Sequence, residues 1–301
     1  MNHPDPHADE HADRFTLLRP LLFTIAYEIL GSATEADDVL QDSYLRWATV
    51  DLDGVRDTKA YLAQLVTRQA LNTLRAEARR REQYVGPWLP EPLLLDDRDA
   101  SADVVLAESV SMAMLVVLET LSPDERAVFV LREVFGFSHD EIAAAVGKSP
   151  AAVRQIAHRA REHVQSRRKR FEPVDAQQSE QITVRFLTAA ATGDIEGLMA
   201  MLAPDVVFTS DSDGKAKAAR RPVLGSAKVA RLLIGLFSRA GAEYRIQAAT
   251  YNSSPAVIVY RDERPDSVFT IEVIEGKIAN FYAMRNPEKL ASVTVRREIS
   301  R

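Results

Sequence analysis

Residues 138–162 read "SHDEIAAAVGKSPAAVRQIAHRARE", and this stretch decides the fold of the central part of the chain. Ser138 and Glu141 have the spacing of a capping box, so a helix is expected to begin here. Gly147 ends that helix, and Ser149 caps the next one. Two short helices joined by a tight turn predict a helix-turn-helix, whose second helix enters the major groove of DNA.

The second helix of this motif has two different faces. Its buried stripe is expected to contain Val153, Ile156, Ala157, Ala160 and Val164. The opposite face offers Arg154, Gln155, His158 and Arg159, with the small residues Ala151 and Ala152 near its start. A plain helical hairpin with a solvated basic face is the alternative. The turn, the two caps and the basic face together favour DNA binding.

Composition narrows the class of protein. The chain has 301 residues, a net charge of −5, 46% hydrophobic residues and no cysteine. Disulfides, thiol nucleophiles and thiolate metal sites are therefore excluded. No apolar run reaches the roughly 18 residues of a membrane span. The polar N-terminus lacks a secretory core, so a cytoplasmic protein is expected, with no cofactor and no metal. The histidines in residues 1–13 could bind a metal, but a disordered tail is the preferred interpretation.

A second basic surface is expected on a helix over residues 58–83. A stripe along it, spaced i, i+4, i+7 and i+11, consists of Arg68, Asn72, Arg75 and Arg79. Arginine and asparagine suit phosphates and exposed base edges, although a solvated face is the alternative. Two basic surfaces on an acidic protein suggest two separate contacts with a polyanion.

The pattern changes beyond Pro173. Helices are expected over about 176–202 and 225–239, and alternating runs such as "PAVIVYRD" and "SVFTIEVIEG" predict antiparallel strands. This part is therefore expected to be an α+β domain.

The segments "ATEADDVLQDSYLRW" and "AYLAQLVTRQALNTLRAEARRRE", with "LSPDERAVFVLREVFGFSHDEIAAAVGKSPAAVRQIAHRARE", resemble the extracytoplasmic-function (group IV) sigma factors of the sigma-70 family. The resemblance implies binding to RNA polymerase core and to promoter DNA. The residues it places on the polymerase are Asp37, Asp38, Gln41, Asp42 and Trp47. It assigns the stripe on the 58–83 helix to the −10 element. For the −35 element it implies Ser149, Ala151, Ala152, Arg154, Gln155, His158 and Arg159.

The C-terminal part resembles SnoaL-like, NTF2-type domains, and the whole chain resembles the sigma-J-type subgroup that carries one. The subgroup's motifs are matched by "WLPEP" at 88–92, "DSDGK" at 211–215 and "NPEKL" at 286–290. Ser212 and Asp213 replace two glycines of the middle motif; aspartate tolerates a positive φ better than most residues.

The linker is expected to dock on the third domain, with Trp88 as its anchor and the prolines holding it extended. The bland alternative is that Trp88 packs only on its own helix. The residues given an interdomain regulatory role are Trp88, Leu89, Pro90, Asp211, Gly214, Lys215, Asn286, Pro287, Lys289 and Leu290.

The expected fold is multidomain, with two all-α domains that bind DNA and polymerase, followed by an α+β NTF2/SnoaL-like domain. The expected division is a disordered tail 1–13, a sigma-2 domain 14–83, a Pro-rich linker 84–103, a sigma-4 domain 104–171, a SnoaL-like domain 175–290 and a tail 291–301.

The function expected is promoter-specific transcription initiation, regulated by the fused domain and needing no separate anti-sigma factor. A stand-alone helix-turn-helix regulator is one alternative. A tethered NTF2-type enzyme is the other, with Asp205, Asp211 or Asp213 as a base, but the third domain has no histidine. No enzyme activity is therefore predicted, while an unknown small ligand of the third domain stays open.

Overall fold

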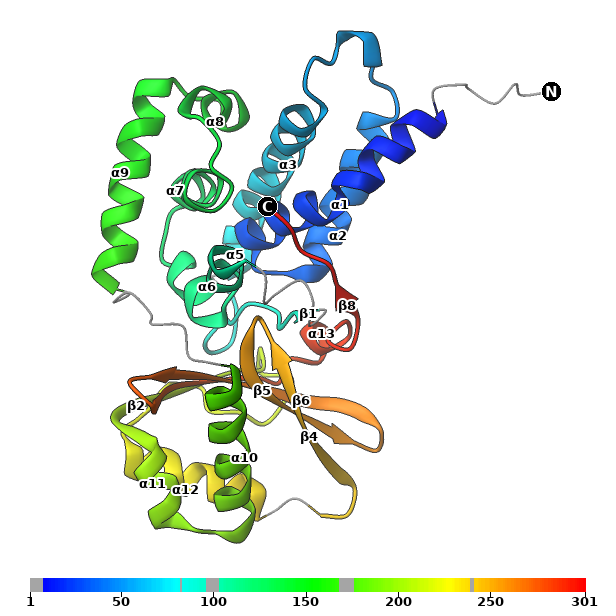
Figure 1. Cartoon of the computed structure of the whole chain (residues 1–301). Coiled ribbons are helices and arrows are strands. Elements are labelled where there is room, and N and C mark those ends of the chain that lie inside the picture. The colour runs from blue at the N-terminus through cyan, green and yellow to red at the C-terminus, as the bar shows by residue number, and fades with distance from the viewer. Residues whose placement is uncertain (1–7, 82, 96–102, 168–175, 239–240) are drawn as a thin grey trace, which may run out of the picture.

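The computed structural model describes residues 8–81, 83–95, 103–167, 176–238 and 241–301. Figure 1 shows two groups of helices side by side, above a curved sheet that is covered by further helices. We call the two groups of helices the first and the second helical domain, in chain order, and we call the sheet with its helices the C-terminal domain. The expected multidomain fold, all-α followed by α+β, is confirmed.

The first helical domain consists of α1 (Ala8–Leu30), α2 (Ala33–Trp47) and α3 (Thr58–Arg81), with a 3-10 turn at Leu52–Gly54. Gly31 follows α1 with φ +72°, which reverses the chain. Ser32 then caps α2, its side chain accepting a hydrogen bond from the Glu35 backbone.

The predicted N-terminal boundary of the first helical domain is wrong. The sequence predicted a disordered tail to residue 13, whereas α1 begins at Ala8. His11 is buried, with its ring centroid 5.2 Å from that of Trp47 and its Nε2 2.8 Å from the Val50 carbonyl oxygen. This histidine therefore belongs to the core of the first helical domain.

The second helical domain contains α5 (Val104–Ser109), α6 (Met112–Leu118), α7 (Pro123–Phe129), a π-helical turn (Val130–Val134), α8 (His139–Val146) and α9 (Pro150–Arg167). The capping box predicted at Ser138 with Glu141 is present, and a second one is formed by Ser122 with Glu125. Gly147 ends α8 in the left-handed conformation, and the predicted apolar stripe of α9 is buried. The helix-turn-helix is confirmed as a structure.

The C-terminal domain contains α10 (Ala176–Thr192), α11 (Ile195–Met201), β2 (Leu202–Asp211), β3 (Val223–Leu224), α12 (Ser226–Phe237), β4 (Tyr244–Tyr251), β5 (Ser254–Arg261), β6 (Arg264–Ile274), β7 (Lys277–Met284) and α13 (Pro287–Leu290). The sheet order is β3-β2-β7-β6-β5-β4-β1-β8, where β1 is Leu94–Leu95 and β8 is Arg296–Arg297. The prediction of purely antiparallel strands is wrong, because β2 pairs with β7 in parallel. The long segment between these two strands, which contains β3, α12 and β4–β6, makes that crossover possible.

Two short strands from outside the C-terminal domain extend its sheet. The linker supplies β1 (Leu94–Leu95), which pairs antiparallel with β4. The last residues supply β8 (Arg296–Arg297), which runs parallel to β1. The segment 291–301, predicted to be a tail, is therefore packed, and Val293 and Ile299 are buried.

Burial is continuous between the domains. One apolar cluster joins α1–α3 to α5–α9 and includes Leu95 and Ile299. A second cluster brings Leu89 of the linker and Met112 of α6 together with Tyr251 and Leu290 of the C-terminal part. Removing such apolar surface from water favours the arrangement in which these domains are packed against one another.

Candidate functional site

The predicted DNA-reading face of α9 is open to solvent. Arg154, Gln155, His158 and Arg159 are exposed, as are Ser149 and Ala151, while Ala152 is half-buried. Ser149 accepts a hydrogen bond from the Ala152 backbone at 3.2 Å and so starts the helix. Arg159 lies 3.7 Å from Glu125 in a partly exposed ion pair. Such a pair is weak, so a DNA phosphate or base can take the place of Glu125 as the partner of Arg159.

The basic stripe on α3 lies partly against the second helical domain. Arg68 Nη2 donates to the Ala144 carbonyl oxygen at 2.7 Å, and Arg75 forms an ion pair with Asp124 at 2.6 Å. Asn72 is exposed, and the side chain of Arg79 lies outside the described part of the chain. Two members of the predicted −10 surface are thus held by α7 and α8 in this arrangement.

The predicted polymerase-binding helix, α2, is partly covered by the C-terminal segment. Asp38, Gln41 and Asp42 are exposed. Asp37 is half-buried, with Arg19 at 3.0 Å and Arg297 of β8 at 2.7 Å. Figure 1 shows the last segment running from the sheet back to the first helical domain.

The role predicted for Trp47 is wrong. The side chain was predicted to contact polymerase, but it has no exposed surface. Its Nε1 donates to the His11 carbonyl oxygen at 2.9 Å, and its ring packs against Tyr61. Trp47 therefore supports α2 from inside the domain and has no free face for a partner.

The linker and the C-terminal domain meet at a buried polar cluster that we call the clasp, consisting of Tyr84, Leu89, Asp211, Asn286 and Lys289. Asp211 is fully buried and accepts hydrogen bonds from the Tyr84 hydroxyl at 2.5 Å and the Leu89 backbone at 2.8 Å. Lys289 Nζ lies 2.8 Å from the same carboxylate and donates to the Leu89 carbonyl oxygen at 2.6 Å. Asn286 donates to the Tyr84 hydroxyl at 2.9 Å.

The clasp therefore joins residues from all three subgroup motifs. Burial, followed by the hydrogen bond to Asp211, raises the pKa of Tyr84 well above its usual range. A buried carboxylate that accepts several hydrogen bonds and faces an ammonium group is compensated for its loss of water.

Exposed contacts flank the clasp. Lys215 lies 2.9 Å from Asp213 and 2.7 Å from Glu288, and its hydrogen bond lowers the pKa of Asp213. Asp213 has φ 47°, so aspartate does supply the left-handed residue that the motif's glycine was expected to provide. A side chain at Gly214 would meet Val85 of the linker at 3.3 Å.

Trp88 lies between two domains, so the alternative that it packs only on its own helix is wrong. The Lys289 ammonium stands 3.9 Å from the centroid of its ring, a cation–π distance. In the first helical domain, a Cβ atom built on Gly31 would come within 2.8 Å of the ring. Gly31 thus both turns the chain and leaves room for the indole.

The prolines of "WLPEP" fit the pattern of backbone donors. Pro90 and Pro92 have no N–H, and the N–H groups of the residues before, between and after them all have acceptors. The acceptor of Leu89 is Asp211, that of Glu91 is the Gly31 carbonyl oxygen, and that of Leu93 is Asn252 Oδ1. An extended, buried segment can therefore cross the interface without unsatisfied donors.

Glu91 attaches the linker to the first helical domain. Its buried carboxylate accepts hydrogen bonds from the Ser32 hydroxyl at 2.8 Å and the Thr34 backbone at 3.0 Å. A carboxylate is favoured at this N-terminus of α2. The linker is thus bound on one side by α2 and on the other by the C-terminal domain.

Asn252 is a connecting residue that sequence reasoning missed. It occupies the β4–β5 turn with φ 52° and is fully buried. Its amide donates to the Tyr27 hydroxyl at 2.7 Å and to the Val110 carbonyl oxygen at 2.8 Å. A turn asparagine gives only a local signal, so neither contact could be found from the sequence.

Glu28 lies buried between the two helical domains. The Ser109 hydroxyl donates to its Oε1 at 2.6 Å, and Arg126 Nε donates to its carbonyl oxygen at 2.8 Å. Burial raises the pKa of Glu28 to about 8, although the Ser109 hydrogen bond and the Arg126 charge oppose this shift. The stability of the packing between the two helical domains therefore depends on the protonation of Glu28.

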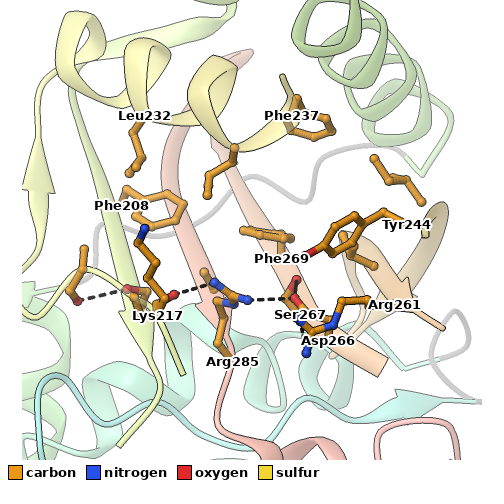
Figure 2. A pocket seen from close by; sticks show the side chains of 17 residues that line it. Phe208, Lys217, Leu232, Phe237, Tyr244, Arg261, Asp266, Ser267, Phe269 and Arg285 are labelled. Atoms are coloured by element: carbon orange, nitrogen blue, oxygen red, sulfur yellow. Dashed lines mark hydrogen bonds and ion pairs between the residues drawn. The ribbon is translucent and has the colours of Figure 1, made fainter. Parts of the chain in front are cut away.

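The C-terminal domain contains a cavity of about 490 Å³. It lies between α12 and the sheet (Figure 2). The acids considered as catalytic bases do not line it: Asp211 and Asp213 lie at the clasp, and Asp205 is exposed elsewhere. Asp266 is the acidic residue of the lining, and Arg285 holds it at 2.9 Å. The described residues contain no group of His, Asp or Glu suited to hold a metal.

Comparisons with known proteins agree with this architecture. The family model described as Sigma-70 region 2 matches residues 15–80, and that described as Sigma-70, region 4 matches residues 111–164. The two helical domains are thus those of a sigma-70 protein.

The chain belongs to the extracytoplasmic-function (ECF) RNA polymerase sigma factors. It is similar to SigJ of Mycobacterium tuberculosis, with 38% identity over 91% of each chain. The crystal structure of that organism's SigJ matches with a TM-score of 0.76 and 34% identity, covering 94% of this chain and 99% of the other. The probable sigma factor SigI of M. tuberculosis is 27% identical over 90% of this chain and 92% of its own length.

Promoter-specific transcription initiation is therefore confirmed as the function, in preference to a stand-alone regulator or a tethered enzyme. A sigma factor acts by binding RNA polymerase core and promoter DNA. Among the described helices, none combines the length and apolar character of a membrane span. The DNA-reading and polymerase-binding residues, and the absence of a separate anti-sigma factor, stay predictions.

Proposed function

We propose that the described arrangement is a closed state, in which the C-terminal domain holds both DNA-reading domains together through the linker. In this cytoplasmic initiation factor, α9 reads the −35 element and α3 reads the −10 element. The main support for this proposal is the set of hydrogen bonds in the clasp. It fixes the linker at Leu89, within the segment that joins the two readers.

The contacts of α3 support a closed state. Phosphate or base contacts need the guanidinium groups of Arg68 and Arg75, which here bind Ala144 and Asp124. DNA and α7–α8 therefore compete for the same donors. Opening must separate the helical domains, and this exposes apolar surface that they now share.

The C-terminal segment competes with polymerase in the same way. Arg297 neutralises Asp37 on the acidic face of α2, which we assign to polymerase core. Core binding then requires a cationic partner to replace Arg297, so release of the C-terminal segment favours holoenzyme formation.

Binding of labelled promoter DNA to the holoenzyme, reconstituted from the full chain and purified core, tests the proposed readers, and run-off transcription measures activity beside it. A promoter is first selected from genomic fragments with the reconstituted holoenzyme. Arg154→Ala and Arg159→Ala are then compared on that promoter and on one with a changed −35 element. A lost base contact weakens binding by about 1–3 kcal/mol on the selected promoter alone.

The matched control is Arg185→Ala, because Arg185 is an exposed arginine of α10. This variant is expected to bind and transcribe like wild type. Unchanged affinity of both α9 variants on both promoters would remove the −35 assignment. An equal loss on both promoters would turn the base contact into a phosphate contact.

A further inference from the structure

The cavity of the C-terminal domain has an apolar body. Its walls carry the rings of Phe208, Phe237 and Phe269, with Leu232 and Leu236 from α12. At about 490 Å³ its volume lies within the roughly 300–1,000 Å³ of typical small-molecule sites. Such a lining favours an aromatic or alkyl group.

One end of the cavity is cationic. Lys217, Arg261 and Arg285 line it, against the single acid Asp266. Arg285 lies 2.9 Å from Asp266, whereas Arg261 lies 3.8 Å from it and is largely exposed. The lining therefore keeps an excess of positive charge beside the aromatic rings.

Two donor groups at this end, the Lys217 ammonium and the Nε–H of Arg285, have no acceptor among the described residues. Within the described part of the chain, no acidic side chain lies within ion-pair distance of Lys217, whose amine is turned towards Phe208 in Figure 2. Arg285 donates through Nη1 to the Lys217 carbonyl oxygen and through Nη2 to Asp266. Its Nε is buried and has no hydrogen-bond partner among the described residues. A buried donor without an acceptor is costly.

We infer that this cavity binds an amphipathic organic anion, whose carboxylate meets Lys217 and Arg285 and whose aromatic or alkyl body lies among the phenylalanines. A carboxylate supplies the missing acceptors and the opposing charge in one group. A neutral molecule of the same shape fills the apolar part but brings no opposing charge to Lys217 and Arg285.

The site adjoins the clasp. Ser210 and Arg285 line the cavity, and the residues that follow them, Asp211 and Asn286, belong to the clasp. The Arg285 backbone also donates to the Asp211 carbonyl oxygen at 2.7 Å. A ligand held by Arg285 therefore contacts the strands that carry the clasp.

Calorimetric titration of the full chain tests the inference with two matched pairs of probes. The aromatic pair is 1-naphthoate and 1-naphthamide, and the alkyl pair is octanoate and octanamide. Within at least one pair, the anion is expected to bind saturably with one site per chain, about tenfold more tightly than its amide. Which pair binds distinguishes an aromatic from an alkyl body.

Three variants locate the site. Lys217→Gln is expected to weaken binding of the anion about two- to fivefold and to leave binding of the amide unchanged, because an exposed charge is worth up to about 1 kcal/mol. Leu232→Trp fills the cavity and is expected to weaken both members of the pair. Lys228→Gln, on α12 outside the lining, is the matched control and is expected to have no effect.

Circular dichroism checks that the Leu232→Trp protein is folded, while Lys217→Gln changes only an exposed side chain. The inference is overturned if neither anion binds saturably. It is also overturned if the amides bind as tightly as the anions, or if Lys217→Gln binds the anion as wild type does.

Discussion

The ammonium group of Lys289 lies 2.8 Å from the carboxylate of Asp211, and this buried pair encloses the backbone of Leu89. Asp211 accepts from the Leu89 N–H, and Lys289 donates to the Leu89 carbonyl oxygen. Both polar groups of one linker residue are thus bound by two charged side chains of the C-terminal domain. Such a buried pair specifies one docking register more than it adds stability.

Asp211→Asn is expected to loosen the linker. The amide keeps the size of the side chain but removes the negative charge that faces the buried Lys289 ammonium, and breaking a buried ion pair costs about 3–5 kcal/mol. Hydrogen exchange of the Leu89 and Glu91 amides measures the opening. The control Asp213→Asn affects a more exposed ion pair and should change the opening by less than about 1 kcal/mol. Equal exchange in the two variants would contradict this account of the clasp.

Arg297→Gln is expected to strengthen binding to polymerase core. The substitution removes the cation that lies 2.7 Å from Asp37 and so frees the acidic face of α2. A partly exposed pair is worth up to about 1 kcal/mol, so the dissociation constant should fall by up to about fivefold. Fluorescence anisotropy with labelled protein measures it, and Arg296→Gln, at an exposed neighbour, is the control. Weaker core binding by Arg297→Gln would speak against the competition.

The packing of the two helical domains is expected to weaken as the pH rises. Glu28 has a pKa of about 8 in the packed state, against an ordinary value of 4.5. Between these values the packed state holds a proton that the separated state has lost. Packing is therefore strongest at the acidic end, and its stabilisation by this proton falls with rising pH until about pH 8, where the change levels off.

Energy transfer between dyes on Asp57→Cys and Glu162→Cys follows the separation, since the chain has no cysteine of its own. Transfer is expected to decrease between pH 6 and pH 8.5 in this labelled protein. Glu28→Gln, which cannot ionise, should remove most of that decrease. An identical pH profile in the two proteins would show that another group titrates.

The sequence predicted those features that local signals determine. The capping box at Ser138, the helix end at Gly147 and the apolar stripe of α9 follow from spacing within a few residues, and all were confirmed. The motif resemblance also predicted that the linker docks on the C-terminal domain. Long-range packing was not predictable, because β8, the burial of His11 and the Asn252 contacts depend on segments far apart in the chain.

Trp47 illustrates the same limit at the level of a site. An aromatic residue on an acidic helix is equally compatible with a partner surface and with the core. Only the position of α1, which places His11 beside the indole, decides between them. The parallel pairing of β2 with β7 was missed for a similar reason, since alternation along a strand does not reveal its neighbour's direction.

The most direct test of the central claim, that the clasp couples the linker to the C-terminal domain and so controls initiation, is a double-mutant cycle on transcription. Run-off transcription from the selected promoter is measured with Trp88→Ala, Asp211→Asn and the double variant. Both single changes are expected to shift activity in the same direction, because either one opens the clasp. The double variant should then differ little from the stronger single variant. Fully additive effects on the free energy would show that Trp88 and Asp211 act independently and would contradict the account.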